Sequence, residues 1–469
     1  MIPASGSAHE HPGGSDDTAP GYAEPPAAPP TGPLSRLLSR RAALTGAAPM
    51  GALAGLAVAG APSLAGRGAA PRPATPAPGE GLNVRSFGAK GDGKADDAAA
   101  FQAALNRAQS SGIGLVVVPP GTYSIGTTLT AQAPIRIAGL TGWSGTTLVF
   151  AGSLATGLLF KQPTTAVVYP GPAMQLTDIG IQYGGTGNAV QFDEGDLSSP
   201  FQDTMIGGCR FQLTGSGVAL YTVNQRDAII TGNQFLGAKS TEGVGIKLSD
   251  SDNTKIVDNV FYNLMYGVYG YRAATRVFDA GCLIVSNSMY GFTDALHFEG
   301  WELVQAIGNI VDGASNNCFY MLDCYHSIVA DNYLGVTGTA PGILMQTQQP
   351  YGVGFLGQIT FRGNYINHYE GASGQAAIAV YGVSATRPED QILIEGNIVN
   401  GYPNHGVHLR NAQNVLVTNN CFSAAASGST TIYDETPGKN HILNNIVDGS
   451  IDADGDTVSS NFTKYPYPT

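Results

Sequence analysis

Residues 87–105 read FGAKGDGKADDAAAFQAAL, and residues 115–125 read LVVVPPGTYSI. Asp96 and Asp97 stand where the N-cap of a helix belongs, because carboxylates there accept hydrogen bonds from unpaired backbone N–H groups. The run that follows places its larger apolar residues on one helical face: Phe101, Ala104, Leu105 and Ala108. The second stretch predicts a buried strand, a turn and another strand. We therefore interpret the three aspartates, Asp92, Asp96 and Asp97, as structural residues that shape a turn and start a short amphipathic helix. A helix of this kind can cover the open end of a solenoid.

A short pattern recurs from the middle of the chain onward: β-branched or apolar residues, a small or polar residue, an asparagine and an apolar pair, as in IITGNQF and ILIEGNIV. The spacing runs from 22 residues (Asn287 to Asn309) to 33 residues (Asn364 to Asn397). Nine asparagines mark the repeats: Asn233, Asn259, Asn287, Asn309, Asn332, Asn364, Asn397, Asn420 and Asn445. Short alternating strands with asparagine or glycine turns predict an all-β fold, a parallel β-helix of about 11 coils with an N-terminal capping helix. A β-propeller would need blades of about 40–45 residues.

The repeated asparagine has two expected uses. Stacked on successive coils, its amide can hydrogen-bond the amides above and below. It also tolerates the left-handed backbone that a tight corner requires.

The rest of the chain divides by composition. Residues 1–38, rich in Pro, Gly, Ala and Ser, are expected to be disordered. Arg40 and Arg41 precede a short Ala/Gly-rich apolar run, so residues 39–66 are interpreted as a twin-arginine export signal. Because a membrane span needs roughly 20 strongly apolar residues, we expect none in the mature chain. A linker (67–82), the β-helix (83–455) and a C-terminal tail (456–469) follow, and we expect a periplasmic or extracellular protein.

Composition also limits the partners. A net charge of −12 with 12% charged residues argues against nucleic acid. The five cysteines form no CxxC pair, so they do not indicate a zinc site. We predict no metal and no other cofactor. Asp193, Glu194 and Asp196, in a loop, are the one alternative, as a calcium site.

The motif at residues 83–126 resembles the N-terminal segment of the pectate-lyase-like superfamily, and the repeats extend this resemblance to about residue 450. The superfamily includes pectin and alginate lyases, family-28-related glycoside hydrolases and phage tail-spike depolymerases. The resemblance implies a right-handed parallel β-helix with a polysaccharide or oligosaccharide substrate along one strand-built face. It does not specify a reaction, because many chemistries occur on this scaffold.

Charged residues are rare, so carboxylates and histidines on outward strand positions are informative. Counting fourteen residues back from Asn309 and from Asn420 aligns ALHFEG with GVHLRN. Strand alternation then points His297 and Glu299 outward on the same face, with His408 and Arg410 at the matching positions. Leu296 and Phe298 point inward, as do Val407 and Leu409. The same count puts Tyr320 outward and Asp323 at the next corner. The candidate catalytic residues are Glu299, Asp323 and His297, and the candidate substrate-binding residues are Tyr290, Asp294, Trp301, Glu302, His326 and Arg410.

Several functions stay open at this point. Glu299 with Asp323 fits the carboxylate pair of a glycoside hydrolase or transglycosylase, the interpretation we favour from sequence. A lyase would use His297 or Tyr290 as its base and Arg410 or Arg362 as the positive charge that stabilises the enolate, although Arg410 lies about four coils from His297, at ~4.8 Å per coil. Residues 290–297 resemble the Tyr-Gly-Phe-Asp-Pro-His core of alginate epimerases, with two insertions and no proline. The motifs of family-28 polygalacturonases are absent.

Two further alternatives remain. Inulin fructotransferases are exported β-helices that work as trimers, so a cyclising transfer and a homotrimer are possible for this chain. A non-catalytic glycan-binding or adhesin solenoid is the third class. Each candidate residue also has an ordinary structural interpretation: a solvated face for His297 and Glu299, a corner pair for Asp323 and His326, and packing under a loop for Trp301.

Overall fold

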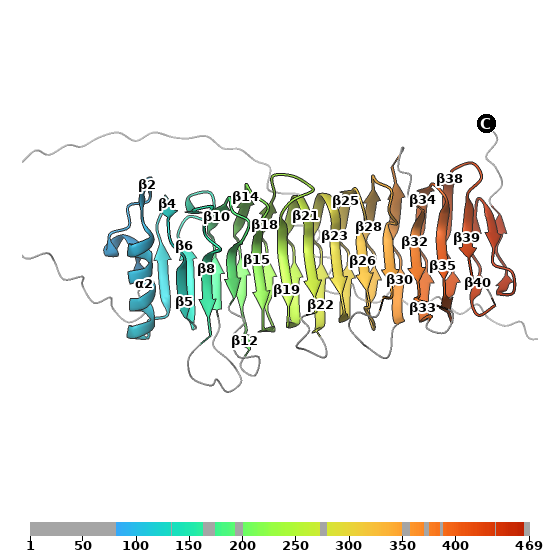
Figure 1. Cartoon of the computed structure of the whole chain (residues 1–469), viewed down its shortest axis with the longest axis horizontal. Coiled ribbons are helices and arrows are strands. Elements are labelled where there is room, and N and C mark those ends of the chain that lie inside the picture. The colour runs from blue at the N-terminus through green and yellow to red at the C-terminus, as the bar shows by residue number, and fades with distance from the viewer. Residues whose placement is uncertain are drawn as a thin grey trace, which may run out of the picture. The chain divides into compact units, whose positions relative to one another are not determined.

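The computed structural model describes residues 81–132, 134–162, 174–192, 200–272, 279–348, 357–369, 375–384, 388–436 and 438–463. Within these ranges the strands form one sheet of 18 strands and another of 26, and neighbouring strands pair in parallel. The coils lie one after another from α2 to the C-terminal strands (Figure 1). The predicted parallel β-helix is confirmed, while the number of coils stays a prediction. The expected disordered segment, the export signal and residues 67–80 of the linker lie outside the described residues.

Three ladders of parallel strands, called stacks 1, 2 and 3, make up the solenoid. Stack 1 is the main ladder of the 18-stranded sheet, and it holds one strand of nearly every coil. Its strands are β3 (Leu115–Val118), β6 (Ile135–Gly139), β9 (Met174–Thr177), β13 (Met205–Gly207), β17 (Ile229–Thr231), β20 (Asp252–Val257), β22 (Asp279–Val285), β24 (Trp301–Ile307), β27 (Ile328–Ala330), β30 (Gly357–Arg362), β33 (Glu389–Glu395), β37 (Leu416–Thr418), β40 (His441–Leu443) and β43 (Thr457–Ser459). The short strands β1 (Leu82–Asn83), β12 (Phe201–Gln202), β16 (Gln225–Arg226) and β36 (Ala412–Gln413) extend the same sheet.

Stack 2 begins at each asparagine corner. Its strands are β2 (Asp92–Asp96), β4 (Gly121–Ile125), β7 (Thr146–Phe150), β10 (Gly180–Tyr183), β14 (Arg210–Leu213), β18 (Gln234–Leu236), β25 (Ile310–Ala314), β28 (Tyr333–Val336), β31 (Tyr365–His368), β34 (Ile398–Tyr402), β38 (Cys421–Ala425), β41 (Ile446–Val447) and β44 (Phe462–Thr463). Three of its core rings, Phe211, Phe235 and Phe261, stack with centroids 4.8 Å apart from coil to coil. The repeated apolar residue of the sequence pattern therefore builds a continuous core.

Stack 3 closes each coil. Its strands are β5 (Leu129–Gln132), β8 (Thr156–Lys161), β11 (Asn188–Phe192), β15 (Val218–Val223), β19 (Val244–Ser249), β26 (Phe319–Leu322), β29 (Ile343–Gln346), β32 (Ala376–Tyr381), β35 (His405–Arg410), β39 (Thr430–Asp434) and β42 (Ser450–Asp452). Two 12-residue strands, β21 (Val260–Tyr271) and β23 (Ser288–Glu299), belong to stack 2 in their first half and to stack 3 in their second.

The asparagine ladder is confirmed. In a representative step, the backbone N–H and the side-chain Nδ2 of Asn287 both donate to Oδ1 of Asn309, at 3.0 Å each. The same two bonds link each of the nine asparagines to the next, and Asn445 passes them on to Asn461. The expected left-handed backbone lies one residue earlier than predicted: Asp258, Ser286 and Gly308, each directly before a ladder asparagine, have φ between 57° and 64°.

The N-terminal cap forms largely as predicted. Helix α2 (Ala98–Ser111) buries Phe101, Ala104, Leu105 and Ala108, and it ends at Gly112 with φ 68°. The aspartates divide the expected roles. Asp96 caps the helix, since its Oδ1 accepts from the N–H of Ala98 at 3.0 Å. Asp97 makes no helix cap; its carboxylate accepts from the N–H groups of Lys90 and Gly91 and holds the preceding turn. A 3-10 helix, η1 (Val84–Phe87), comes before this turn.

The last coils extend beyond the expected boundary at residue 455. Strand β43 pairs with β40, and β44 pairs with β41, so residues 457–463 continue the solenoid and are not a tail. All five cysteines carry free thiols, and four of them are buried. Across the ranges that the structure covers, no helix is both long and apolar enough to cross a bilayer.

Candidate active site

The candidate site lies where β23 passes from stack 2 into stack 3. Phe292 is in register with Ala314 of β25, whereas Leu296 is in register with Phe319 of β26. As predicted, Leu296 and Phe298 are buried in the core. His297 and Glu299 alternate with them and point outward, where they meet side chains of the neighbouring coils.

Three side chains of β23 form a hydrogen-bonded row with an imidazole in the middle. His297 Nδ1 lies 3.2 Å from Oδ2 of Asp294, and His297 Nε2 lies 2.9 Å from Oε1 of Glu299. The histidine side chain is 11% exposed and that of Glu299 is 22% exposed. The row therefore presents its glutamate end to solvent and keeps its aspartate end inside.

The aspartate end is fixed by the next coil. Oδ1 of Asp294 accepts hydrogen bonds from the side-chain amide of Asn316 at 2.6 Å and from the backbone N–H of Asn317 at 2.8 Å. The Nδ2 group of Asn317 donates to the same oxygen at 3.0 Å. With Oδ2 directed at His297, Asp294 can orient the imidazole but has little surface left for a substrate.

Tyrosines surround the imidazole ring. The ring centroid of His297 lies 4.4 Å from that of Tyr320, 5.0 Å from that of Tyr266 and 5.2 Å from that of Tyr269. The hydroxyl of Tyr269 also donates to Oε1 of Glu299 at 3.4 Å. In-register pairing places Tyr269 one coil before His297 and Tyr320 one coil after it. The site therefore spans three coils.

These contacts change the acid–base properties of the group. Burial lowers the pKa of His297, but hydrogen bonds to Asp294 and Glu299 outweigh burial and raise the pKa above its ordinary value. Burial raises the pKa of Asp294, yet its bonds to His297 and Asn317 leave that pKa lowered. Burial, with the charges of Glu299 and Asp294, raises the pKa of Tyr320 to about 12. The tyrosines keep their protons, while the imidazole holds its proton more firmly than a free histidine does.

Glu302 and His326, expected beside His297, form a separate pair. Glu302 lies past the corner at Gly300, where the chain enters stack 1, and His326 lies beside it on the next coil, with His326 Nδ1 2.9 Å from Oε1 of Glu302. The hydroxyl of Tyr325 donates to the other carboxylate oxygen of Glu302 at 3.2 Å. The structure thus divides the predicted cluster between two faces of the solenoid.

Asp323 and Trp301 differ from their expected exposure. Asp323 is 1% exposed, has φ 50° at its corner and accepts from the N–H of Gln348. The charge of Asp323 adds to burial in raising the pKa of Glu389, so these two carboxyl groups are neighbours inside the solenoid. Trp301 is fully buried against Phe298, with ring centroids 5.5 Å apart. The prediction that Trp301 binds substrate is therefore wrong, because this side chain packs in the core. Tyr290 is outward and 37% exposed, on the stack 2 part of β23.

The predicted alignment of ALHFEG with GVHLRN is confirmed by the register. His297, Tyr320, Leu344, Ala379 and His408 follow one another at the same position of successive stack 3 strands. His408 is therefore four coils from His297, about 19 Å at ~4.8 Å per coil. It forms its own group, with Nδ1 2.9 Å from the hydroxyl of Tyr381 and Nε2 2.7 Å from Glu435.

Two cations flank the His297 row on stack 3. Arg410 lies over the ring of Tyr381, 4.2 Å from its centroid, and Lys247 lies between the rings of Tyr221 and Tyr271 at 5.0 and 4.8 Å. Within the ranges that the structure covers, neither cation has a carboxylate within ion-pair distance.

No metal site accompanies this arrangement in the described part of the chain, where three or more His, Cys, Asp or Glu side chains do not gather as a metal ion would require. The acidic group Asp193, Glu194 and Asp196 lies outside the described residues.

Two family models match the sequence. "Rhamnogalacturonase A/epimerase, pectate lyase-like" matches residues 81–273, and "Right handed beta helix region" matches residues 294–464. These matches place residues 81–273 in a pectate-lyase-like family and residues 294–464 in a right-handed β-helix family, both within the superfamily that the sequence motif resembles. The handedness expected from the resemblance is thereby confirmed.

Solved structures of this superfamily share the fold. The mannuronan C-5 epimerase AlgE6 A-module of Azotobacter vinelandii matches with TM-score 0.54 and 16% identity, over 82% of this chain and 100% of that chain. Tailspike protein 3 of bacteriophage CBA120 matches with TM-score 0.54 and 14% identity, over 78% of this chain and 61% of that chain. At these identities the likeness extends to the fold alone.

A short stretch is more similar to curated proteins. It is 54% identical over 43 residues to alginate lyase 7 and 51% identical over 43 residues to mannuronan C5-epimerase AlgE6, both of Azotobacter vinelandii. The stretch covers 9% of this chain and 5% of either relative, so the chain matches only a small part of their length.

Sequence reasoning missed several members of this candidate site. Asn316 and Asn317 anchor Asp294, and Lys247 and Glu435 take part in the stack 3 surface. The tyrosines, in contrast, are visible in the sequence as candidate sugar-stacking residues, because GVYGYR alternates Tyr269 and Tyr271 on the outward side of a strand. No comparable signal exists for the two asparagines, whose role depends on a corner between stacks.

Proposed function

We propose that this protein is a carbohydrate-active enzyme that removes the C5 proton of a uronate residue in an acidic polysaccharide, as lyases and C5-epimerases do. One observation carries the proposal: the row Asp294–His297–Glu299, ringed by protonated tyrosines. Asp294 holds the Nδ1–H of His297, which leaves Nε2, 2.9 Å from Oε1 of Glu299, as the nitrogen that exchanges protons in this proposal.

The chemistry needs a base and hydrogen-bond donors at one sugar. A proton beside a carboxylate becomes removable when the charge that develops on that carboxylate is stabilised as the base takes the proton. His297 Nε2, once it has lost its proton, is the base in this proposal, and Asp294 positions it as the buried aspartate does in a catalytic triad. The hydroxyl groups of Tyr320 and Tyr269 supply protons or hydrogen bonds to the sugar oxygens.

An acidic substrate fits the charges on stack 3. Lys247 is two coils before His297 in the register, and Arg410 is four coils after Glu299. Each cation is stacked on tyrosine and lacks a carboxylate partner in the described part of the chain. Sugar carboxylates along the solenoid would pair with them. The short similarity to proteins named alginate lyase and mannuronan C5-epimerase agrees with a uronate substrate.

The paired-carboxylate hydrolase, favoured from sequence, has weaker support. Such a mechanism needs two carboxyl groups facing the glycosidic bond. Glu299 is accessible, but Asp323 is 1% exposed at its corner and Asp294 is 4% exposed, with both of its oxygens hydrogen-bonded. Abstraction of a proton by His297 does not require a second carboxylate at the sugar.

A substrate panel tests the proposal. Alginate, polygalacturonate and neutral glucans are incubated with the wild type, with His297→Gln and with His326→Gln, which removes the histidine that pairs with Glu302 outside the His297 row. Unsaturated uronates are followed by ultraviolet absorbance, epimers by NMR and reducing ends by colorimetry. We expect a uronate polymer to be converted by the wild type and His326→Gln only. Reducing ends from a neutral glucan, or full activity of His297→Gln, would overturn the proposal.

A further inference from the structure

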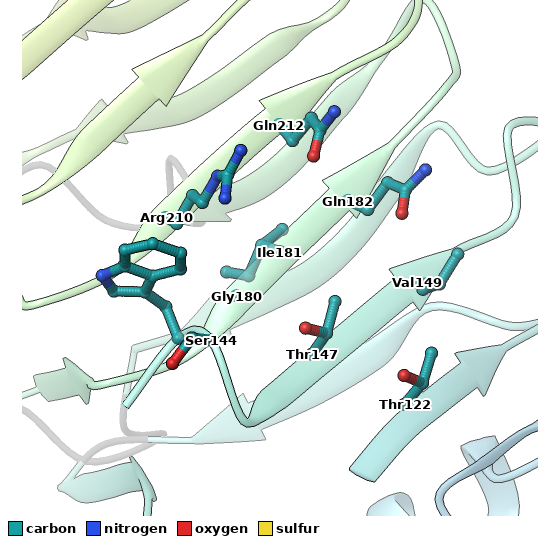
Figure 2. A pocket seen from close by; sticks show the side chains of 10 residues that line it. Thr122, Ser144, Thr147, Val149, Gly180, Ile181, Gln182, Arg210 and Gln212 are labelled. Atoms are coloured by element: carbon teal, nitrogen blue, oxygen red, sulfur yellow. The ribbon is translucent and has the colours of Figure 1, made fainter. Parts of the chain in front are cut away.

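A second site is built on stack 2, near the capped end of the solenoid. A pocket of about 360 Å³ lies over four neighbouring strands: β4, β7, β10 and β14. Figure 2 shows polar side chains from these strands projecting to the same side of the sheet. Those that matter here are Thr122, Thr147, Gln182, Arg210 and Gln212, with Trp143 beside them.

Arg210 is the charged group of the pocket. Its guanidinium lies over the indole of Trp143, 4.9 Å from the ring centroid. Its Nε is buried and has no hydrogen-bond partner among the described residues. In the described part of the chain, no carboxylate lies within ion-pair distance of Arg210. Leaving a buried donor without an acceptor costs free energy, and an anion bound here would receive the hydrogen bond from the guanidinium.

The remaining wall suits a sugar. Gln182 and Gln212 are in register on β10 and β14, and each carries both a donor and an acceptor. Trp143 adds an apolar ring of the kind on which a sugar face packs. The space itself depends on Gly180, in register with Thr147 on one side and Arg210 on the other. A Cβ at Gly180 would lie 2.8 Å from the backbone oxygen of Trp143 and 2.9 Å from Oγ1 of Thr147.

We infer that this pocket is a binding site for a single carboxylate-bearing sugar residue of an acidic glycan. Arg210 pairs with the sugar carboxylate, Trp143 lies against the sugar, and Gln182 and Gln212 bond its hydroxyl groups. The pocket is separate from the His297 row, because it belongs to stack 2 and its strands precede β23 by several coils. It holds glycan without acting on it, and it does not depend on the proposed function.

Tryptophan fluorescence reads this pocket selectively. The chain has two tryptophans; Trp301 is fully buried in the core, and Trp143 lines the pocket. The full chain is titrated with trigalacturonate and trimannuronate, with maltotriose as the neutral sugar and with sodium sulfate at equal ionic strength. We expect a saturable change with at least one uronate trimer and none with maltotriose or sulfate. A response to sulfate as strong as to the trimers, or no response to either trimer, would overturn the inference.

Variants separate the pocket from the rest of the molecule. Arg210→Gln removes the positive charge. Glutamine is compatible with this strand position, because Gln234 occupies the same register position one coil later. We expect this variant to weaken binding at least tenfold. Arg136→Gln, an exposed arginine of stack 1, and His297→Gln should bind as the wild type does, and equal melting temperatures show that all the variants are folded. Wild-type affinity in Arg210→Gln would contradict the inference whether or not the protein has the proposed activity.

Discussion

Oδ2 of Asp294 lies 3.2 Å from Nδ1 of His297, three residues later on the same strand. Side chains three apart on a flat strand point to opposite faces. The contact exists because β23 leaves β25 after Phe292 and joins β26 at Leu296, so the strand turns between stacks within the intervening residues. The candidate site is therefore a product of the corner that joins two ladders.

Asp294→Asn tests the orienting role of this contact. The bonds to Asp294 and Glu299 hold the pKa of His297 above its ordinary value, so activity that needs the neutral imidazole rises with pH through that pKa. Without the Asp294 charge the rise should shift to lower pH, and kcat should fall by about 10²-fold with little change in KM. A pH series of kcat and KM measures both. An unshifted profile would mean that Asp294 is structural only.

Asn309→Ala tests the asparagine ladder. The side chain of Asn309 takes part in four hydrogen bonds, two accepted from Asn287 and two donated to Ile284 and Asn332. Its loss leaves the buried N–H of Asn287 without its partner, at about 1–3 kcal/mol, and also removes the bonds to Ile284 and Asn332. Denaturant unfolding should show a loss of about 3 kcal/mol or more. Asn106→Ala, at an exposed site on α2, serves as the control and should change stability by less than about 1 kcal/mol.

The position before each ladder asparagine gives a paired prediction about backbone strain. Gly308 has φ 64°, and a Cβ there would meet no heavy atom within 4 Å, so Gly308→Ala should cost only the left-handed penalty of about 1 kcal/mol. Ser286 has φ 58° at the equivalent position, and Ser286→Gly should stabilise by about 0.5 kcal/mol. Thermal melts of the two variants should move in opposite directions. Movement in the same direction would contradict this explanation of the GN, SN and DN pairs.

Glu389 gives a pH prediction for stability. Burial, with the charge of Asp323 beside it, raises the pKa of Glu389 well above its ordinary value. Neither of its carboxyl oxygens has a hydrogen-bond partner in the part of the chain that the structure describes. The folded state keeps the proton that the unfolded state loses, so this group destabilises the fold as pH rises from the unfolded pKa through the folded pKa. Glu389→Gln should match the wild type near pH 4 and exceed its melting temperature at pH 8. Glu395→Gln, on the same strand, is the control; a gain independent of pH would contradict the prediction.

The sequence predicted what repeats locally. The nine ladder asparagines, the apolar face of α2 and the outward direction of His297 all follow from helix or strand periodicity, and all are observed. It failed where a corner intervenes. Trp301 follows the corner at Gly300, and alternation before a corner does not determine which side the next residue faces. The contact between Asp323 and Glu389 could not be predicted either. The coils between them vary in length from 22 to 33 residues, so counting along the chain does not align the two positions.

Proton exchange at C5 tests the central claim most directly. The wild type and His297→Gln are incubated in D₂O with oligomannuronate and oligogalacturonate, and the sugars are followed by proton NMR. The account predicts that the wild type either replaces the C5 proton by deuterium, with inversion, or forms a C4–C5 double bond, and that His297→Gln does neither. New reducing ends with every C5 proton retained would contradict this claim and would favour a glycoside hydrolase.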